Sequence, residues 1–119
     1  MNGNRDKGVL IHIIQYCNQI AEAIDIFGND YGTFVSSNTY RNACCLCLLQ
    51  IGELVGTLSD SFLAAHKQIP WRQIKGFRNI VAHAYGTIEP AVVWDIISND
   101  LSPLKDYCQA CLAEFQRQE

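Results

Sequence analysis

Apolar residues recur every three to four positions along most of the chain, which is the pattern of amphipathic helices. The first such segment predicts a helix from about Asp6 to Phe27, which ends where Gly28 suits a helix C-terminus. No stretch shows a convincing alternation typical of a strand, and only "TFVSS" at 33–37 is ambiguous. The pattern therefore favours an all-α fold.

A second long helix is predicted from Asn38, a good N-cap residue, to about Leu58. Apolar side chains cover much of its circumference, as expected for the central helix of a bundle or for one shared with a second subunit. Gly52 and Gly56 lie four residues apart on it. Two small residues at this spacing would let another helix come close.

Prolines and glycines divide the rest of the chain into shorter helical segments. Ser59 begins a short one, Pro70 suits the first position of a helix that runs to Gly86, and Pro90 and Pro103 open two more. Five or six helices with short connections predict an up-down bundle of the four-helix type with one or two additional short helices. We expect residues 1–119 to form a single domain.

Composition limits the class of protein further. Of the 119 residues, 49% are hydrophobic and 18% are charged, which is typical of a globular protein. No run approaches the roughly 18 apolar residues of a membrane span, and the start lacks the apolar core of a signal peptide, so we expect a cytoplasmic protein without membrane contact. Six cysteines, expected as thiols and as small core residues with no bound metal, are Cys17, Cys44, Cys45, Cys47, Cys108 and Cys111.

Charge is distributed unevenly along the chain. The net charge is −3, so the molecule as a whole does not attract nucleic acid. Between Asp60 and Glu89, however, there is no acidic residue. That segment contains Lys67, Arg72, Lys75, Arg78 and the histidines His66 and His83. An anionic ligand is therefore expected to bind there.

Within this segment, "FRNIVAHAYG" places polar residues on the helix face opposite its apolar stripe. Arg78 and Tyr85 are seven residues apart and nearly superimpose in projection, whereas Asn79 and His83 form a neighbouring pair. Arg78 and His83 diverge by about 140° on an ideal helix. Three arrangements would still let them meet: the arginine folds across Ala82, the helix loosens near its end, or a second copy in a two-fold dimer completes the site.

Acid–base cleavage of an RNA phosphodiester fits these residue types. Histidine can exchange a proton near neutral pH, and arginine can bind phosphate oxygens and stabilise the charge of the transition state. Asn79 could hydrogen-bond either His83 or the substrate. Because the 2′-hydroxyl of RNA supplies the nucleophile, neither a metal ion nor any other cofactor is required, and no carboxylate cluster accompanies the motif.

The stretch "RNIVAHAY" resembles the R-x4-H-x-Y signature of the HepT-like toxins, a branch of the HEPN superfamily of small all-helical ribonucleases. The surrounding "IPWRQIKGFRNIVAHAYGTI" and the upstream "IGELVG" are also similar to that branch. The resemblance covers roughly residues 8 to 115. The Arg–His spacing alone is a weak motif, whereas the preceding Pro-Trp, the asparagine and the tyrosine make the combination more specific.

This resemblance implies roles for individual residues. Arg78 and His83 would be the catalytic pair of a metal-independent endoribonuclease, at a cleft where two protomers of a homodimer meet. Tyr85 would be the tyrosine that a cognate minimal nucleotidyltransferase antitoxin modifies with AMP, in a type VII-like toxin–antitoxin pair. Glu53, in the "GE" of the upstream motif, would orient Arg78. Beside this pair, Asn79 and two residues of the locally basic segment, Lys75 and Arg72, are expected to support RNA binding.

Other interpretations stay open from the sequence. The polar face could carry no chemistry, and Tyr85 could be an ordinary amphipathic aromatic at a helix end. The chain could instead be a non-catalytic helical module that docks onto a nucleotidyltransferase and supplies a nucleotide- or partner-binding surface. A thiol-based metal or redox sensor is a third hypothesis, although paired cysteines that hold zinc usually lie in turns rather than within helices.

Overall fold

The computed structural model of the chain describes residues 2–87 and 89–118, without the side chains of residues 2–3 and 83–87. Within these ranges the chain forms eight helices and no strand, which confirms the all-α class. The helices are α1 (Asn2–Phe27), α2 (Tyr31–Ser36), α3 (Asn38–Val55), α4 (Asp60–Ala65), α5 (Trp71–Lys75), α6 (Phe77–Thr87), α7 (Pro90–Asn99) and α8 (Leu101–Gln118).

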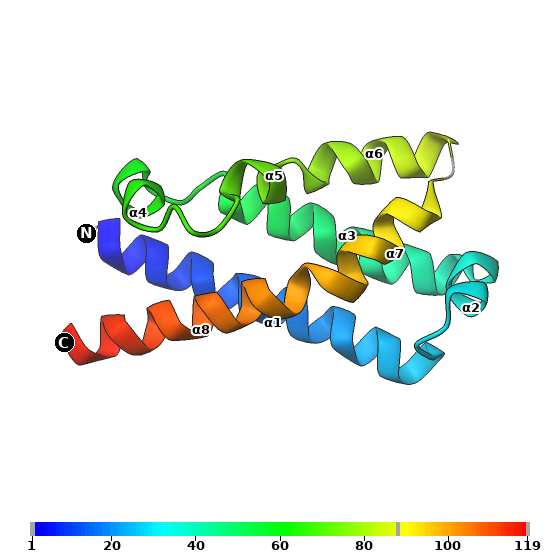
Figure 1. Cartoon of the computed structure of the whole chain (residues 1–119), viewed down its shortest axis with the longest axis horizontal. Coiled ribbons are helices and arrows are strands. Elements are labelled where there is room, and N and C mark those ends of the chain that lie inside the picture. The colour runs from blue at the N-terminus through cyan, green and yellow to red at the C-terminus, as the bar shows by residue number, and fades with distance from the viewer. Residues whose placement is uncertain (1, 88, 119) are drawn as a thin grey trace.

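Four rods of helix run alternately up and down along the long axis of the molecule (Figure 1). The rods are α1, α3, the pair α5–α6 and the pair α7–α8, while the short helices α2 and α4 lie at opposite ends of the bundle. The two chain termini lie at the same end, beside α4. The predicted up-down bundle is confirmed, with more short segments than the five or six helices expected. No helix in the described ranges has both the length and the apolar character needed to cross a membrane.

Local hydrogen bonds explain the structure before the second helix, where the sequence left one segment ambiguous and placed the N-cap one residue late. The ambiguous segment 33–37 is largely helical and belongs to α2, because the Asp30 carboxylate caps it by accepting from the backbone N–H of Thr33 at 2.9 Å. The N-cap of α3 is Ser37 rather than Asn38, since the Ser37 hydroxyl accepts from the N–H of Tyr40 at 3.1 Å. Side-chain capping thus fixes the first residues of both α2 and α3.

The helix expected from Pro70 to Gly86 is divided into two. Pro70 precedes the first helical residue, Trp71, instead of occupying that position. The chain then turns slightly at Gly76, whose N–H bonds to the carbonyl of Arg72 at 3.1 Å, and continues as α6. Likewise α8 begins at Leu101, so Pro103 lies in its first turn, where a missing N–H leaves no bond unmade.

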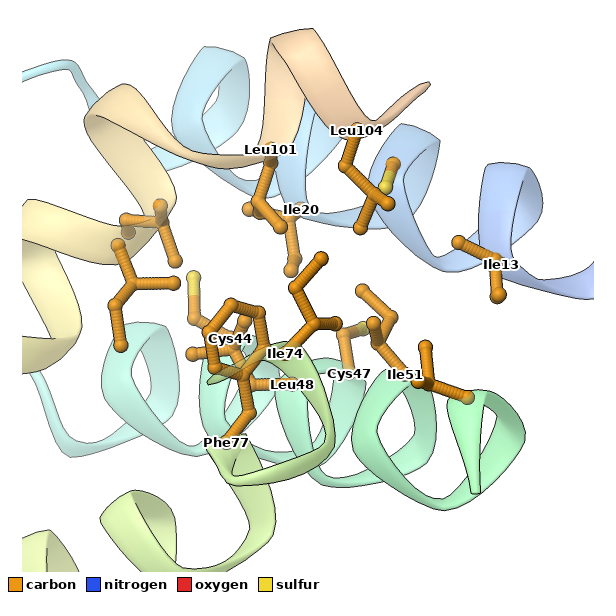
Figure 2. Packing of buried hydrophobic residues seen from close by; sticks show 14 of the residues in the cluster. Ile13, Ile20, Cys44, Cys47, Leu48, Ile51, Ile74, Phe77, Leu101 and Leu104 are labelled. Carbon is orange, nitrogen blue, oxygen red and sulfur yellow. The ribbon is translucent and has the colours of Figure 1, made fainter. Parts of the chain in front are cut away.

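The core lies between the four rods. Figure 2 shows apolar side chains from α1, α3, α5, α6 and α8 converging on one interior, among them Ile20, Leu48 and Phe77. All six cysteines are buried free thiols, including Cys45, which lies off the main predicted stripe. The prediction that the cysteines pack as small core residues is therefore confirmed.

Hydrogen bonds also fix the start of α5, which carries part of the basic segment. The indole N–H of Trp71 donates to the carbonyl oxygen of His66 at 2.7 Å. The His66 ring nitrogen Nδ1 lies 2.7 Å from the hydroxyl of Tyr107 on α8, and that hydroxyl donates to Gln68 at 3.0 Å. The connection between α4 and α5 is thereby tied to α8, so the basic segment begins from a fixed point.

Candidate functional site

A groove of about 480 Å³ runs between the C-terminal half of α3 and the junction of α5 with α6. It lies in the segment that the sequence identified as locally basic. Nine residues line it: Gly52, Glu53, Gly56, Thr57, Arg72, Lys75, Gly76, Arg78 and Asn79. Five of the seven predicted site residues are therefore brought together, namely Glu53, Arg72, Lys75, Arg78 and Asn79.

Glycine at position 52 allows the two sides of the groove to meet. A Cβ atom on Gly52 would lie 3.1 Å from both the backbone nitrogen of Arg78 and the carbonyl oxygen of Lys75. Because these are backbone atoms of helices, they cannot turn away as a side chain could. The spacing of Gly52 and Gly56 predicted a close approach, and the structure places the α5–α6 junction against this part of α3.

An ion pair joins the two sides. The Nε atom of Arg78 on α6 lies 3.0 Å from Oε1 of Glu53 on α3. The side chains are 65% and 48% exposed, so the pair contributes at most about 1 kcal/mol to stability. The pair links α3 to α6, and both of its side chains belong to residues that line the groove. The contact between Glu53 and Arg78 is present, while a role for it in catalysis stays a prediction.

The remaining cations of the groove lie on α5. Arg72 and Lys75 are both exposed and line the groove, and Asn79 lies next to Arg78 on α6. With Glu53 as the acidic residue among the nine that line the groove, three cations face one anion. The groove therefore has a net charge of +2, in a protein whose net charge is −3. The groove therefore attracts an anion, although the protein as a whole is negatively charged.

The backbone of His83 and Tyr85 belongs to α6, but their side chains lie outside the described part of the structure. The helix is uninterrupted from Phe77 to Thr87. It therefore does not loosen before His83, and positions 78 and 83 keep an angular separation of about 140° around its axis. The predicted roles of His83 and Tyr85 stay predictions.

The buried thiols have properties different from those of metal-binding or reactive cysteines. Burial raises the pKa of Cys17, Cys44 and Cys108 to about 12, so these thiols stay protonated at neutral pH. Among the described residues, no three histidine, cysteine or acidic side chains are grouped so that they could hold a metal ion.

Sequence reasoning missed Thr57 and Gly76 as lining residues. Thr57 lies directly after the C-terminal cap of α3, where its hydroxyl donates to the carbonyl of Leu54 at 2.7 Å. Gly76 lies between α5 and α6. Neither carries a chemical signal of its own, and each reaches the groove only because a helix ends beside it.

The region of the chain that is similar to known proteins includes all the residues of the groove. Residues 13–111 match the family described as "Ribonuclease HepT-like". "Putative RNase MJ1380" of Methanocaldococcus jannaschii is 30% identical over 100 residues, which span 83% of this chain and 89% of that protein. "Probable ribonuclease HepT" of Thermococcus cleftensis is 30% identical over 95 residues, which span 76% and 86% of the two chains. No solved structure matches the chain.

Proposed function

The chain belongs to the HepT-like ribonuclease family, and from this premise we propose that it is an endoribonuclease whose active site includes the groove between α3 and α5–α6. One observation supports this site above all others. The arginine of the R-x4-H motif lies in a groove of net positive charge, and Glu53 holds its guanidinium at 3.0 Å. A fixed guanidinium in a basic groove suits a phosphate group.

The proposed reaction uses the substrate's own nucleophile. The 2′-oxygen of one ribose attacks the adjacent phosphorus while the bond from phosphorus to the 5′-oxygen of the next nucleotide breaks. The products are a 2′,3′-cyclic phosphate and a free 5′-hydroxyl. The 2′-hydroxyl loses a proton and the leaving 5′-oxygen gains one; His83 carries out one of these two transfers, and water carries out the other. Arg78 binds the oxygens of the phosphate and stabilises their added negative charge in the transition state. Neither step requires a metal ion.

A homodimer would complete the site. Positions 78 and 83 diverge around an uninterrupted helix, so a single copy of α6 does not aim both at one small target. A two-fold interface brings the same patch of each protomer together, and the arginine of one protomer can then meet the histidine of its partner.

The family relationship also supports a place in a toxin–antitoxin pair of the type VII-like class. In this proposal the chain is the toxin, and a minimal nucleotidyltransferase antitoxin transfers AMP to Tyr85. The added phosphate would be negatively charged and bulky on the same helix as Arg78 and His83. It would therefore repel RNA and occupy space meant for it.

The test is cleavage of RNA by the purified protein in the presence of EDTA. Wild type is expected to produce 2′,3′-cyclic phosphate ends, and His83→Ala is expected to lower kcat by about 10²- to 10⁴-fold because proton transfer is lost. His12→Ala is the matched control, since His12 is an exposed histidine on α1 outside the groove. Its activity should equal that of wild type.

Two outcomes would contradict the proposal in different ways. If EDTA abolishes cleavage and a divalent metal restores it, the metal-independent chemistry is wrong. If wild type and His83→Ala leave RNA equally intact while both remain folded, the chain is not a ribonuclease. The second result would favour a non-catalytic module that docks onto a nucleotidyltransferase.

A further inference from the structure

The cations of the groove are held at separate points along α3. Arg78 reaches α3 at Glu53, where its Nε lies 3.0 Å from the carboxylate. Lys75 reaches α3 one turn later, since its Cε would lie 3.5 Å from a Cβ atom on Gly56. Three residues separate these two points, which corresponds to about 4.5 Å along a helix. The guanidinium and the ammonium therefore occupy neighbouring positions rather than one.

Along the α5–α6 side of the groove, the cations form a row. Arg72, Lys75 and Arg78 follow each other at intervals of three residues, and Gly76 between α5 and α6 has a right-handed helical backbone conformation. The N–H of Asn79 bonds to the carbonyl of Gly76 at 3.0 Å, which joins the start of α6 to the end of α5. Six residues of helix span about 9 Å. This row is longer than a single phosphate group.

The charge balance of the row is uneven. Glu53 forms its ion pair with Arg78, and the other residues that line the groove include no second carboxylate. The positive charge of Lys75 and Arg72 is therefore not neutralised by the lining of the groove. Lys75 also lies near the C-terminus of α3, where a cation is favoured by the helix dipole. Stabilising α3 is thus the competing explanation for Lys75.

We propose that Lys75 and Arg72 form a second phosphate subsite, which binds the phosphate next to the one that is cleaved. This inference rests on the proposed ribonuclease function and specifies its substrate. The substrate is an RNA strand that continues along α5 by at least one nucleotide beyond the cleaved bond. Because the subsite contacts the backbone and not the bases, it adds affinity and sets the register without reading sequence.

The test uses oligonucleotides in which one ribonucleotide stands in an otherwise 2′-deoxy strand, so that only one bond can be cleaved. The phosphate on either side of the scissile one is replaced in turn by an uncharged methylphosphonate. For wild type, one of the two replacements should lower kcat/KM by about tenfold, since a charge-assisted contact is lost. For Lys75→Gln the same replacement should have little further effect, because the two changes remove the same contact.

A binding experiment makes the inference independent of catalysis. The ligand is an RNA with every 2′-hydroxyl methylated, which the proposed chemistry cannot cleave. Lys75→Gln and Arg72→Ala should each weaken binding. Each should also reduce the slope of log Kd against log salt concentration by about one, which corresponds to one lost phosphate contact. Lys67→Ala, which removes an exposed lysine outside the groove, should leave both quantities unchanged.

The outcomes separate the two proposals. If wild type cleaves RNA but the methylphosphonate lowers kcat/KM equally in wild type and in Lys75→Gln, Lys75 does not contact that phosphate and the subsite is wrong. Weaker binding and a smaller salt dependence in Lys75→Gln and Arg72→Ala, without any cleavage by wild type, keep a phosphate site at these residues and overturn the ribonuclease proposal. If Lys75→Gln lowers the free energy of unfolding while binding and its salt dependence match wild type, Lys75 serves only to stabilise α3 and the subsite is wrong.

Discussion

Arg78 is the one residue of the proposed catalytic pair whose side chain is described, and its surroundings define how it could act. An arginine on an exposed helix face would sample many rotamers, and binding a phosphate would cost the conformational entropy of that freedom. The carboxylate of Glu53 contacts Nε of Arg78, and Arg78 lines the groove. Glu53 thus orders the guanidinium, although its negative charge also opposes the approach of RNA.

These two effects of Glu53 predict opposite changes in binding and catalysis. In Glu53→Gln the groove gains one unit of net positive charge, so RNA should bind several-fold more tightly at low salt. The guanidinium loses its anchor at the same time, so kcat should fall by about tenfold. The pair is exposed, and the free energy of unfolding should change by less than about 1 kcal/mol. Steady-state kinetics and urea unfolding measure the three quantities.

The control for this prediction is Glu22→Gln, which removes an exposed carboxylate of α1 outside the groove. It should leave kcat and KM unchanged. An unchanged kcat in Glu53→Gln would show that Glu53 does not position Arg78 for the reaction, even if binding becomes tighter.

At the scale of elements, the groove depends on how closely α3 approaches the junction of α5 and α6. Gly52 is the contact point, because backbone atoms of Lys75 and Arg78 lie where its Cβ would be. Gly52→Ala should therefore destabilise the protein by about 1–3 kcal/mol through overpacking, although alanine favours a helix more than glycine does. The separation of the helices should also displace Arg78 from Glu53 and lower RNA cleavage.

Gly8 on α1 provides a matched control. A Cβ atom there would meet nothing within 4 Å. Gly8→Ala should stabilise the protein by about 0.5–1 kcal/mol, since only the helix propensity changes. Chemical unfolding of both variants measures the difference. A Gly52→Ala protein as stable as Gly8→Ala would mean that α3 and the α5–α6 junction are not in tight contact.

The same elements show what the sequence can and cannot predict. The spacing of Gly52 and Gly56 predicted the close approach, because glycines four residues apart present no side chain that would keep another helix away. The ambiguous segment at 33–37 became helix α2 through the cap at Asp30, a contact that apolar periodicity does not contain. Likewise the division at Gly76 is not contained in the apolar periodicity, which continues from Ile74 to Phe77 across it. Glu53 could be paired with Arg78 in advance only through the resemblance to a family, because the two residues are 25 positions apart.

At the scale of the whole molecule, the distribution of charge and of apolar side chains suggests how two copies could cooperate. The bundle buries its six cysteines within a cluster of apolar side chains between the four rods. Leu46, however, is 57% exposed on α3, the helix that also carries Glu53. A partly apolar surface on the same helix as the groove is compatible with the proposed two-fold interface, which would bring two basic grooves near each other.

The proposed dimer can be tested by combining two inactive proteins. If the arginine and the histidine of one active site come from different protomers, Arg78→Ala and His83→Ala are each inactive, but a mixed dimer contains one intact pair. Random reassociation of equal amounts makes half of the dimers mixed, and one site in each of them works, so about a quarter of wild-type activity should return. The measurement is RNA cleavage after the two variants are unfolded and refolded together.

As a control, each variant refolded alone must remain inactive. If the mixture also stays inactive although size-exclusion chromatography shows dimers, the two side chains do not act across an interface. Because α6 is uninterrupted between positions 78 and 83, the arginine would then have to turn toward the histidine of its own helix.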